Sequence, residues 1–311
     1  MSVPWSDFEI DFAVENGAVV LQENSKPVAE APVIPAHFCG HLCSPRIKSK
    51  TTFETSSEGV TMYPKTLLGR AAIISGSSAG IGAAIARELS ARGANIVLNY
   101  PFPELEAECK AVGQTLQTSW IAVCADLSTL EGPELLVDAA VKEFGHIHIL
   151  VNNAGVVPHG PTWEIDGAKW DRAMNLNARG TFFLTKAVLP HLTPYQRSTP
   201  PAASGVLGGS RIISTKGALD SMIKNWAKEL PPIYGCTVNG VAPGPVNTKT
   251  FRTSFAPELE EIKASFSEGT PCEGSVADED DIAWTVAFLA EPRSKWINGE
   301  YINVNGGLMI I

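Results

Sequence analysis

A glycine-rich turn is the first stretch of the sequence that could do chemistry. Residues 75–82 read SGSSAGIG and stand between a short apolar segment and a segment with helical spacing. Gly76 permits a tight turn, Gly80 lets the backbone approach a ligand, and Gly82 lets a helix pack closely on a strand. A helix that starts here offers free N–H groups and its positive dipole end to an anion. The turn predicts a site for a dinucleotide pyrophosphate, although any tight strand–helix turn favours glycine.

Histidine and cysteine alternate in a second cluster, near the amino terminus. It consists of His37, Cys39, His41 and Cys43, which are residue types that bind zinc. The spacing differs from the common zinc frameworks, in which each cysteine pair leaves room for a tight knuckle. We therefore expect no metal site and interpret the cluster as incidental residues of a flexible tail.

The elements that must position these residues alternate along the chain from about residue 67. Apolar segments predict strands, and segments with helical spacing predict the helices between them. We expect strands at 70–75, 94–98, 120–124, 147–151, 211–213, 236–241 and 301–304, and helices at 81–92, 131–144, 170–189, 218–230 and 278–289. Repeated β-α-β units with apolar strands predict an α/β fold of the Rossmann type, a doubly wound parallel sheet in three layers.

Length divides the chain into two parts. Residues 67–311 suffice for a single Rossmann-fold domain, and residues 1–66 remain as an amino-terminal extension that we expect to be flexible. The extension starts with acidic residues and has no apolar core segment, so it resembles neither a mitochondrial nor a secretory signal. It is either a true tail or an artefact of gene prediction.

Charge and composition exclude several function classes. The net charge of the chain is −9, which argues against nucleic acid or an anionic membrane as a partner. The longest apolar runs are shorter than the ~18 residues that span a bilayer. The six cysteines are dispersed, which is typical of reduced thiols in a cytoplasmic protein.

Further motifs follow the glycine turn in a characteristic order. The turn itself has the spacing G-x-x-x-G-x-G, and after it come Asp126-Leu127, NNAG at 152–155, NARG at 177–180, PGPVNT at 243–248 and WING at 296–299. Over residues 67–308 the chain thereby resembles the short-chain dehydrogenase/reductases. Within that family it is most similar to the carbonyl reductases and the 3-oxoacyl-carrier-protein reductases.

The resemblance implies a nicotinamide cofactor with a defined set of contacts. The glycines and Ile81 would hold the pyrophosphate, and Asp126 would bond the adenine. Val246 and Thr248 would contact the nicotinamide amide. The expected cofactor-binding residues are Gly76, Ser78, Gly80, Ile81, Gly82, Asn99, Asp126, Leu127, Asn153, Ala154, Gly155, Lys216, Pro243, Gly244, Val246 and Thr248. Two alternatives stay open: Asp126 merely caps the turn before the next serine, and the asparagines at 152–153 are ordinary turn residues.

The end of the second strand bears on the choice between NAD(H) and NADP(H). An acid there would bond the 2′-hydroxyl of the ribose and select NAD(H). The strand ends instead in Asn99-Tyr100-Pro101, without an acid, and Ala79 occupies one usual position of a base that would hold a 2′-phosphate. We expect NADP(H) rather than NAD(H).

The catalytic group that the resemblance implies is incomplete. The family uses a Tyr-x-x-x-Lys pair on one helix, with a serine and an asparagine nearby, and the ammonium lowers the pKa of the tyrosine. Lys216, Asn177 and Ser214 match three of these positions, but Ile212 stands where the tyrosine belongs. A loop and a helical turn between the fifth strand and Lys216 are expected to be missing. Alternatively, Ser214 has no catalytic role and Asn177 is an ordinary helix residue.

A histidine is the remaining candidate to replace the tyrosine. His159 and His191 flank the expected cleft, and a histidine has a suitable pKa. Exposed loop histidines without a catalytic role are the simpler interpretation.

Two functions compete on these residues. The first is a ketoreductase of secondary metabolism, an oxidoreductase that uses NADP(H) on a carbonyl or a secondary alcohol. The second is a catalytically inactive nucleotide-binding or subunit-interaction protein, with a mis-spliced gene prediction as a variant. Tyrosine loss favours the second, and the complete cofactor motifs favour the first.

The segment 247–270 corresponds to the variable substrate lid of the family. Its apolar residues are Phe251, Phe255, Leu259, Ile262 and Phe266. They suit a hydrophobic or polyketide-like substrate, or they pack on the body as one face of an amphipathic helix. The expected partners are this small-molecule carbonyl or alcohol and further copies of the chain. The family implies a dimer or tetramer built on the two long helices that flank the fifth strand.

Overall fold

The chain divides into two compact units, residues 1–60 and 61–311, in a computed structural model. The structure describes residues 11–15, 18–22, 65–156, 162–192, 202–207, 213–254, 259–272 and 276–310. In the first unit, β1 (Asp11–Glu15) and β2 (Ala18–Gln22) pair as an antiparallel hairpin. The sequence analysis did not predict these two strands.

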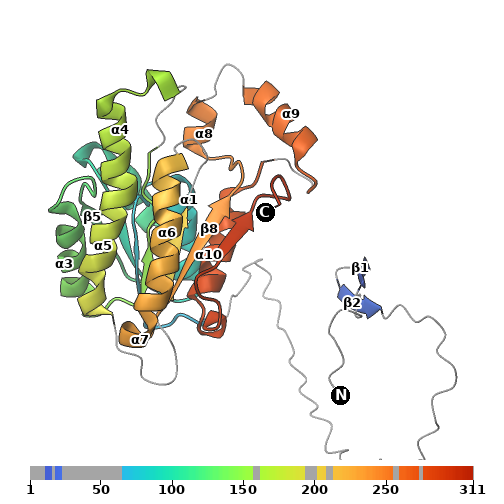
Figure 1. The fold of residues 1–311 in the computed structure, drawn as a ribbon. Helices are drawn as coiled ribbons and strands as arrows, with labels where there is room; N and C mark the ends of the chain where they lie inside the picture. Colours follow the sequence, from blue (N-terminus) through green and yellow to red (C-terminus); the bar gives the residue numbers. More distant parts are fainter. Residues whose placement is uncertain are drawn as a thin grey trace, which may run out of the picture. The chain divides into compact units, whose positions relative to one another are not determined.

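A seven-stranded sheet forms the centre of the second unit (Figure 1). Its order is β5-β4-β3-β6-β7-β8-β9, and all neighbouring strands are parallel. The strands are β3 (Ala71–Ile74), β4 (Asn95–Tyr100), β5 (Trp120–Cys124), β6 (Ile149–Val151), β7 (Ala202–Leu207), β8 (Thr237–Pro243) and β9 (Tyr301–Val304). The strand order reverses between β3 and β6, and ligands of such sheets bind at the carboxyl ends beside this point. The predicted doubly wound parallel sheet is confirmed.

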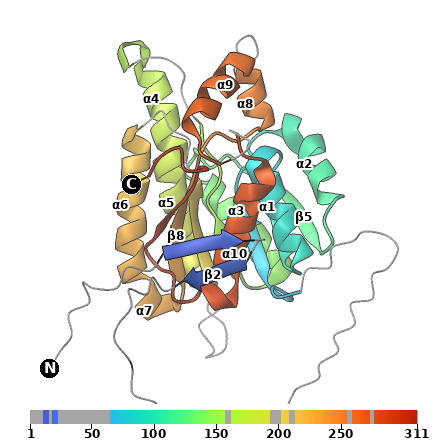
Figure 2. The same ribbon diagram turned by 90° about the vertical axis from the view of Figure 1, so that its right-hand side faces the viewer.

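Helices cover both faces of the sheet and complete the three predicted layers (Figures 1 and 2). Helices α1, α2 and α10 pack on one face, and α3, α5 and α6 pack on the other. The helices are α1 (Gly80–Ala91), α2 (Glu106–Gly113), α3 (Gly132–Phe144), α4 (Gly167–Ala173), α5 (Thr181–Val188), α6 (Ile213–Glu229), α7 (Pro231–Tyr234), α8 (Lys249–Ser254), α9 (Leu259–Gly269) and α10 (Glu279–Ala290). Short 3₁₀ turns are η3 (Pro103–Leu105), η4 (Thr162–Glu164), η6 (Leu189–His191) and η7 (Pro292–Ser294), and η5 (Met174–Gly180) is a π-helix.

Alternate residues of the strands face opposite helical layers. Ile74 and Leu98 belong to the apolar core beneath α1 and α10, whereas Ile73 and Val97 belong to the core beneath α3, α5 and α6. All four residues are at most 1% exposed. Successive side chains of a strand point to opposite faces. Apolar residues at every position are therefore what a sheet buried on both sides requires.

The fifth strand of the core is not where the sequence analysis placed it. We predicted residues 211–213, but the strand between β6 and β8 is β7, and Ile213 already belongs to α6. The sequence of β7 is AASGVL, whose small residues have low strand propensity. The segment is nevertheless a strand because it pairs in parallel with β6 on one side and with β8 on the other. Residues 208–212 separate β7 from α6, so the strand does not run almost directly into Lys216 as we had expected.

Two predicted helices also differ from the structure. The long helix predicted at 170–189 consists of α4, the π-helical η5 and α5 in succession. The helix predicted at 218–230 begins earlier, at Ile213, and ends at Glu229. Both differences concern the elements that carry the candidate catalytic residues.

Arg92 joins the end of α1 to the end of α10. Its guanidinium lies 2.6 Å from the carboxylate of Glu88 and 2.9 Å from that of Glu291. The hydroxyl of Thr66 donates to Glu291 at 2.6 Å, and the N–H of Leu67 donates to the carbonyl of Arg92 at 2.9 Å. These contacts fix the first described residues of the second unit onto two helices.

Candidate functional site

The glycine turn connects β3 to α1 at the carboxyl edge of the sheet. Gly76 and Gly80 both have a φ of +61°, which glycine adopts without strain. A Cβ on Gly82 would lie 2.5 Å from the carbonyl oxygen of Gly76 and 2.6 Å from Nδ2 of Asn153. A Cβ on Gly76 would lie 2.9 Å from the Cα of Ala154. Glycine is therefore required because the loop after β6 packs directly against the turn.

The first turn of α1 is suited to an anion. The residue before it, Ala79, makes no side-chain cap, and the turn contains no acidic residue. The first N–H groups of a helix have no partner inside the helix, and together with the helix dipole they favour a phosphate. Ser78, Gly80 and Ile81 are partly exposed. This edge therefore fits the pyrophosphate of a dinucleotide.

Ser75 couples the turn to the loop after β6. Its hydroxyl donates to the carbonyl of Val151 at 3.2 Å and accepts the N–H groups of Asn153 at 2.9 Å and Ala154 at 3.0 Å. The amide of Asn153 donates in return to the carbonyls of Ser75 and Gly76, both at 2.9 Å. The sequence analysis missed Ser75, which is fully buried; a serine directly after a buried strand was the only signal.

Two further asparagines act as internal supports of this edge. Asn99 is 1% exposed, and its Oδ1 accepts the N–H of Gly76 at 3.1 Å. Its Nδ2 donates to the carbonyl of Ala125 at 3.0 Å, so β4 links the turn to the end of β5. Asn152 donates to the hydroxyl of Thr185 on α5 at 3.1 Å. Both amides are therefore engaged inside the protein.

Asp126 forms a local turn just after β5. Its Oδ1 accepts the N–H of Ser128 at 2.9 Å and the hydroxyl of Ser128 at 2.7 Å. This is the turn-capping role that we considered as an alternative. Leu127 is buried beside it, and Arg179 of η5 donates to the carbonyl of Ser128. The Asp126 side chain is partly exposed, so an adenine contact stays a proposal alongside the capping role.

Asn177 connects the loop after β6 to α6. It lies in the π-helix η5, and π-helical turns frequently occur at functional sites. Its Nδ2 donates to the carbonyl of Val156 and its Oδ1 accepts the N–H of Val156, both at 2.8 Å. Nδ2 also lies 3.5 Å from Oγ1 of the fully buried Thr215. A Cβ on Gly155 would lie 3.3 Å from Oδ1, so Asn177 packs against the NNAG loop.

Lys216 lies in the first turn of α6, directly after Thr215. It is partly buried, and this burial lowers the pKa of its ammonium to about 8. Ser214 belongs to the same helical turn. Through Thr215 and Asn177, the structure brings the first turn of α6 next to the loop that packs on the glycine turn. Ile212, at the tyrosine position, lies outside the described residues.

The described tyrosines do not supply the missing group. Tyr100 is 5% exposed in β4, and burial is the main cause of its raised pKa. Tyr301 begins β9 at the amino edge, and burial raises its pKa as well. Tyr234 ends α7, beyond the far end of α6. No tyrosine among the residues that the structure describes lies beside Lys216.

His191 is too far from the candidate site to replace the missing tyrosine. The carbonyl of His191 accepts the N–H of Ile147 at 3.1 Å, just before β6 begins. His191 therefore lies at the amino edge of the sheet, opposite the turn, and this alternative is wrong. His159 lies outside the described residues.

The segment after β8 returns to the glycine turn. β8 ends at Pro243, and the N–H of Gly244 donates to the last residue of β9 at 2.8 Å. Val246 is 6% exposed and forms an isolated β-bridge with Ala277, which lies just before α10. A Cβ on Gly80 would lie 3.7 Å from the methyl carbon of Thr248. The segment that runs from the end of β8 to the start of α1 therefore contains four of the predicted cofactor-binding residues, which are Pro243, Gly244, Val246 and Thr248.

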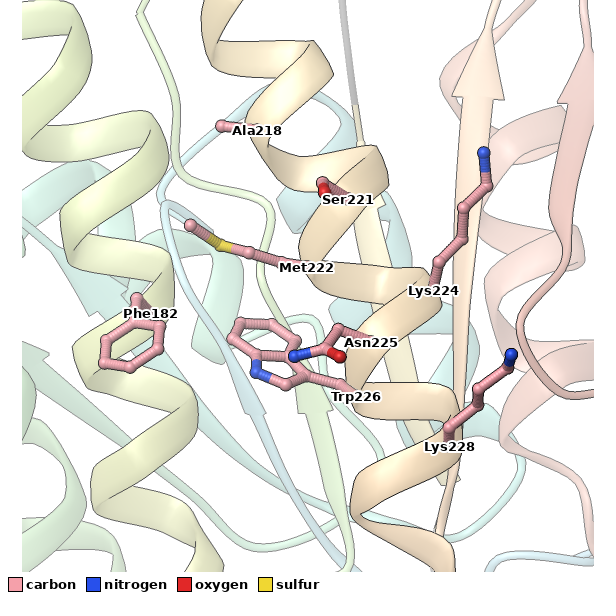
Figure 3. A pocket seen from close by; sticks show the side chains of 8 residues that line it. All are labelled: Phe182, Ala218, Ser221, Met222, Lys224, Asn225, Trp226 and Lys228. Atoms are coloured by element: carbon pink, nitrogen blue, oxygen red, sulfur yellow. The ribbon is translucent and has the colours of Figure 1, made fainter.

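A groove lies elsewhere, on the outer faces of α5 and α6 (Figure 3). Phe182 of α5 and Met222, Asn225 and Trp226 of α6 are among its lining residues. The rings of Phe182 and Trp226 are 6.0 Å apart. None of the lining residues belongs to the expected cofactor set, so this groove is distinct from the candidate nucleotide site.

Three sequence-based expectations concern metal, membrane and thiols. Among the described residues no three His, Cys, Asp or Glu side chains form a group that could hold a metal ion, and the cluster at 37–43 lies outside them. No helix in the described part of the chain is long and apolar enough to cross a membrane. Cys109, Cys124, Cys236 and Cys272 are free cysteines.

Comparison with known proteins identifies relatives over most of the chain. Residues 76–309 match the family described as enoyl-(acyl carrier protein) reductase. The short-chain dehydrogenase/reductase FrzI of Cladobotryum sp. is 39% identical over 256 residues, which cover 80% of this chain and 99% of the relative. The hydroxynaphthalene reductase-like protein Arp2 of Metarhizium robertsii is 32% identical over 260 residues, covering 78% of this chain and 96% of the relative.

Solved structures share the fold of most of the chain. A blue fluorescent protein from a metagenomic library, in complex with NADPH, superimposes with a TM-score of 0.69 at 30% identity, covering 79% of this chain and all of that protein. A short-chain dehydrogenase from Burkholderia cenocepacia in complex with NADP gives a TM-score of 0.68 at 28% identity, covering 78% of this chain and 99% of that protein. Both relatives were crystallised with the phosphorylated nicotinamide cofactor.

Proposed function

Because the chain belongs to the short-chain dehydrogenase/reductases, a family of oxidoreductases, we propose that it uses NADP(H) to interconvert a carbonyl and a secondary alcohol. One observation carries this proposal. Asn177 bonds the loop that packs on the glycine turn, and it also reaches Thr215, the neighbour of Lys216. A fitting nucleotide site and a partly buried ammonium are thereby joined at one edge of the sheet.

The proposed cofactor would be held largely by backbone groups. The N–H groups at the start of α1 would bind the pyrophosphate, Asp126 would bond the adenine, and Val246 and Thr248 would contact the nicotinamide amide. Asn99 and Asn153 would act through the turn, because their amides already bond its backbone. When bound, the nicotinamide supplies or accepts a hydride.

The chain's own catalytic residues would position groups and move a proton. Lys216 would donate hydrogen bonds to the nicotinamide ribose, and Asn177 would hold the η5 bend and a water of the proton relay. The tyrosine that protonates the alkoxide in the family pattern is replaced by Ile212. Loss of a general acid typically lowers the rate by about 10²–10⁴-fold, so we expect slow turnover.

Preference for NADP(H) over NAD(H) is part of the proposal. It is supported by the absence of an acid at the end of β4, where Asn99 is followed by Tyr100 and Pro101. The NADPH and NADP complexes of two structural relatives agree with it.

An apolar, polyketide-like carbonyl compound in secondary metabolism is the proposed substrate class. The lid helices α8 and α9 carry Phe251, Leu259 and Phe266, all partly buried. The name of the Metarhizium relative, a hydroxynaphthalene reductase-like protein, refers to an aromatic compound and supports an apolar substrate.

Self-association and a cytoplasmic location complete the proposal. The groove on the outer faces of α5 and α6 carries the exposed Phe182, which suits a dimer or tetramer contact (Figure 3). The four free cysteines of the described part are compatible with a reducing compartment. Light scattering after gel filtration would measure the oligomeric state.

The alternative is a nucleotide-binding protein without catalysis, and the replaced tyrosine favours it. The test is NADPH binding by calorimetry together with NADPH oxidation on a panel of apolar ketones. We expect binding and slow turnover, and the substitution Ile212→Tyr should raise turnover at least about tenfold. Binding without turnover in both proteins would reject the enzyme, and absence of binding would reject both functions. Sequencing the transcript across residues 209–216 would show whether the tyrosine was lost by mis-splicing.

A further inference from the structure

An ion pair links two segments that are far apart in the sequence. Nζ of Lys249, the first residue of α8, lies 2.8 Å from Oε1 of Glu108 in α2. The two residues are separated by 141 positions. Figure 2 shows α8 and α2 near each other at the end of the molecule that carries the start of α1. The pair therefore connects the lid to the helix that follows the second strand of the core.

The position of this pair relates it to the candidate nucleotide site. Lys249 follows Thr248, whose methyl carbon would lie 3.7 Å from a Cβ on Gly80. On the other side, Glu108 lies in the first turn of α2, shortly after β4 ends at Tyr100. The lysine thus extends from above the glycine turn toward the end of β4. That is where the ribose of the adenosine lies in dinucleotide-binding sheets of this kind.

Lys110, the base that acts on Tyr100 at the end of β4, is already paired with Glu106 at 2.6 Å. Residues 75–82 and 93–105 contain neither lysine nor arginine. In NADP-dependent sheets a cation near the end of the second strand holds the 2′-phosphate. The lid brings such a cation from the opposite half of the chain, which spacing within the first half could not reveal.

We propose that Lys249 is the residue that recognises the 2′-phosphate of NADP(H). This inference rests on the proposed function, because it assumes that the edge binds a nicotinamide dinucleotide. In the structure Glu108 holds the ammonium beside the first turn of α2. On binding, the 2′-phosphate takes over this ammonium, and the lid helix α8 is drawn toward the adenosine.

The charges around Lys249 permit this exchange of partners. Lys249 and Glu108 are 68% and 36% exposed, and an ion pair so exposed contributes little to stability. A phosphate monoester carries a charge of about −1.5 to −2 and attracts the ammonium more strongly than a carboxylate does. Of the other acids at the start of α2, Glu106 is paired with Lys110 at 2.6 Å, and Glu104 is exposed.

The experiment compares binding of NADPH and NADH to three variants of the full chain. Dissociation constants are measured by calorimetry, without turnover. Lys249→Met should weaken NADPH binding about tenfold and leave NADH binding unchanged, because one charge-assisted hydrogen bond is lost. Lys249→Arg should retain most of the NADPH affinity. Glu108→Gln should tighten NADPH binding about two- to threefold, because it removes the competing carboxylate.

Glu108→Gln is also the control for a displaced lid. It breaks the same ion pair as Lys249→Met, so a purely structural role of the pair would weaken NADPH binding in both variants. Equal losses of NADPH and NADH in Lys249→Met would show a contact with the pyrophosphate, which both cofactors share, and would overturn the inference. So would unchanged affinities. If the unmodified chain binds neither cofactor, the proposed function itself fails, and that result is distinguishable from the others.

Discussion

Two regions of the site differ in what holds them together. We call residues 75–82 with the loop 151–156 the nucleotide edge, and residues 213–216 with Asn177 the catalytic turn. In the nucleotide edge, backbone groups and buried amides bond one another, and the ligand would meet mainly backbone N–H groups. The catalytic turn depends on the identity of single side chains, and one of the expected side chains is isoleucine. The backbone groups that would bind a nucleotide are therefore present in this chain, whereas one side chain of the catalytic pattern is not.

The largest expected effect would break the nucleotide edge. Gly82→Val places side-chain atoms where only 2.5 Å separates an added Cβ from the carbonyl oxygen of Gly76. Overpacking of this kind costs about 1–3 kcal/mol. Because the turn must shift to relieve it, the N–H groups that would bind the pyrophosphate move, and NADPH affinity should fall by up to about 100-fold. Calorimetry measures the affinity, and circular dichroism establishes that the variant is folded. Affinity within about threefold of the unmodified chain would show that the turn tolerates a side chain.

A second variant tests whether the two regions are independent. Asn177→Ala leaves both the N–H and the carbonyl of Val156 without their partner. Each unsatisfied buried group costs about 1–3 kcal/mol, so the free energy of unfolding in urea should fall by about 2–4 kcal/mol. Asn177→Asp should lose at least as much, because it keeps the acceptor for the N–H but places a buried carboxylate oxygen against the carbonyl of Val156. A loss of NADPH affinity as large as that of Gly82→Val would show that the regions act as one.

Acid should weaken the strands beneath the nucleotide edge. His148, before β6, accepts the N–H of Ala71 on Nδ1 at 3.1 Å, and burial lowers the pKa of His148 to about 4. The unfolded chain then binds the proton more tightly, so stability falls as the pH drops from about 6.5 to about 4. The loss should be on the order of 2–3 kcal/mol. Urea unfolding at pH 7, 5.5 and 4.5 measures it, and His148→Asn should show a flatter profile than the unmodified chain.

Alkali should act on the catalytic turn instead. Because the pKa of Lys216 is about 8 in the folded chain, its ammonium is lost above that pH. NADPH affinity should then fall by up to about tenfold between pH 7 and 9.5, since a charge-assisted hydrogen bond is lost. The free energy of unfolding should change in the opposite direction. It should rise between pH 8 and about 10.5, because the unfolded chain holds this proton more tightly than the folded chain does. Lys216→Arg, which stays charged, should show no such fall in affinity; a parallel fall would assign the titration to another group.

The smallest expected effect concerns the residue next to the catalytic turn. Gly217 directly follows Lys216, and a Cβ on it would meet no atom within 4 Å. Gly217→Ala should therefore raise the free energy of unfolding by about 0.5–1 kcal/mol, because glycine disfavours a helix. NADPH affinity should not change. Thermal unfolding provides the measurement, and destabilisation would mean that the start of α6 is more crowded than the structure indicates.

The fold was predictable from sequence where the signal is local. The glycine turn, the strands on both sides of it and β9 lie where apolar pattern and turn chemistry place them. The hairpin also had a local signal, because Asn16-Gly17 between two short apolar segments is typical of a two-residue hairpin connection. By contrast, β7 has a weak strand sequence and exists because β6 and β8 pair with it. No window of the sequence contains that information.

The candidate site likewise contains some residues that the sequence could predict and others that it could not. Spacing alone assigned Gly76, Gly80 and Gly82, although the loop after β6 supplies part of the steric reason for glycine at positions 76 and 82. The engagement of Asn99 with Gly76, and of Lys249 with Glu108, depends on strands and helices that meet only in the folded chain. Long-range contacts of this kind decide which polar residues support the site and which face a ligand.

The contacts of Arg92 have a practical consequence for protein engineering. Since Thr66 and Leu67 are bonded to Glu291 and Arg92, the first described residues of the second unit are tied to the ends of α1 and α10. A shortened chain made for protein production should therefore keep Thr66 and Leu67. Without them the ends of α1 and α10 would lose these two contacts, far along α1 from the glycine turn.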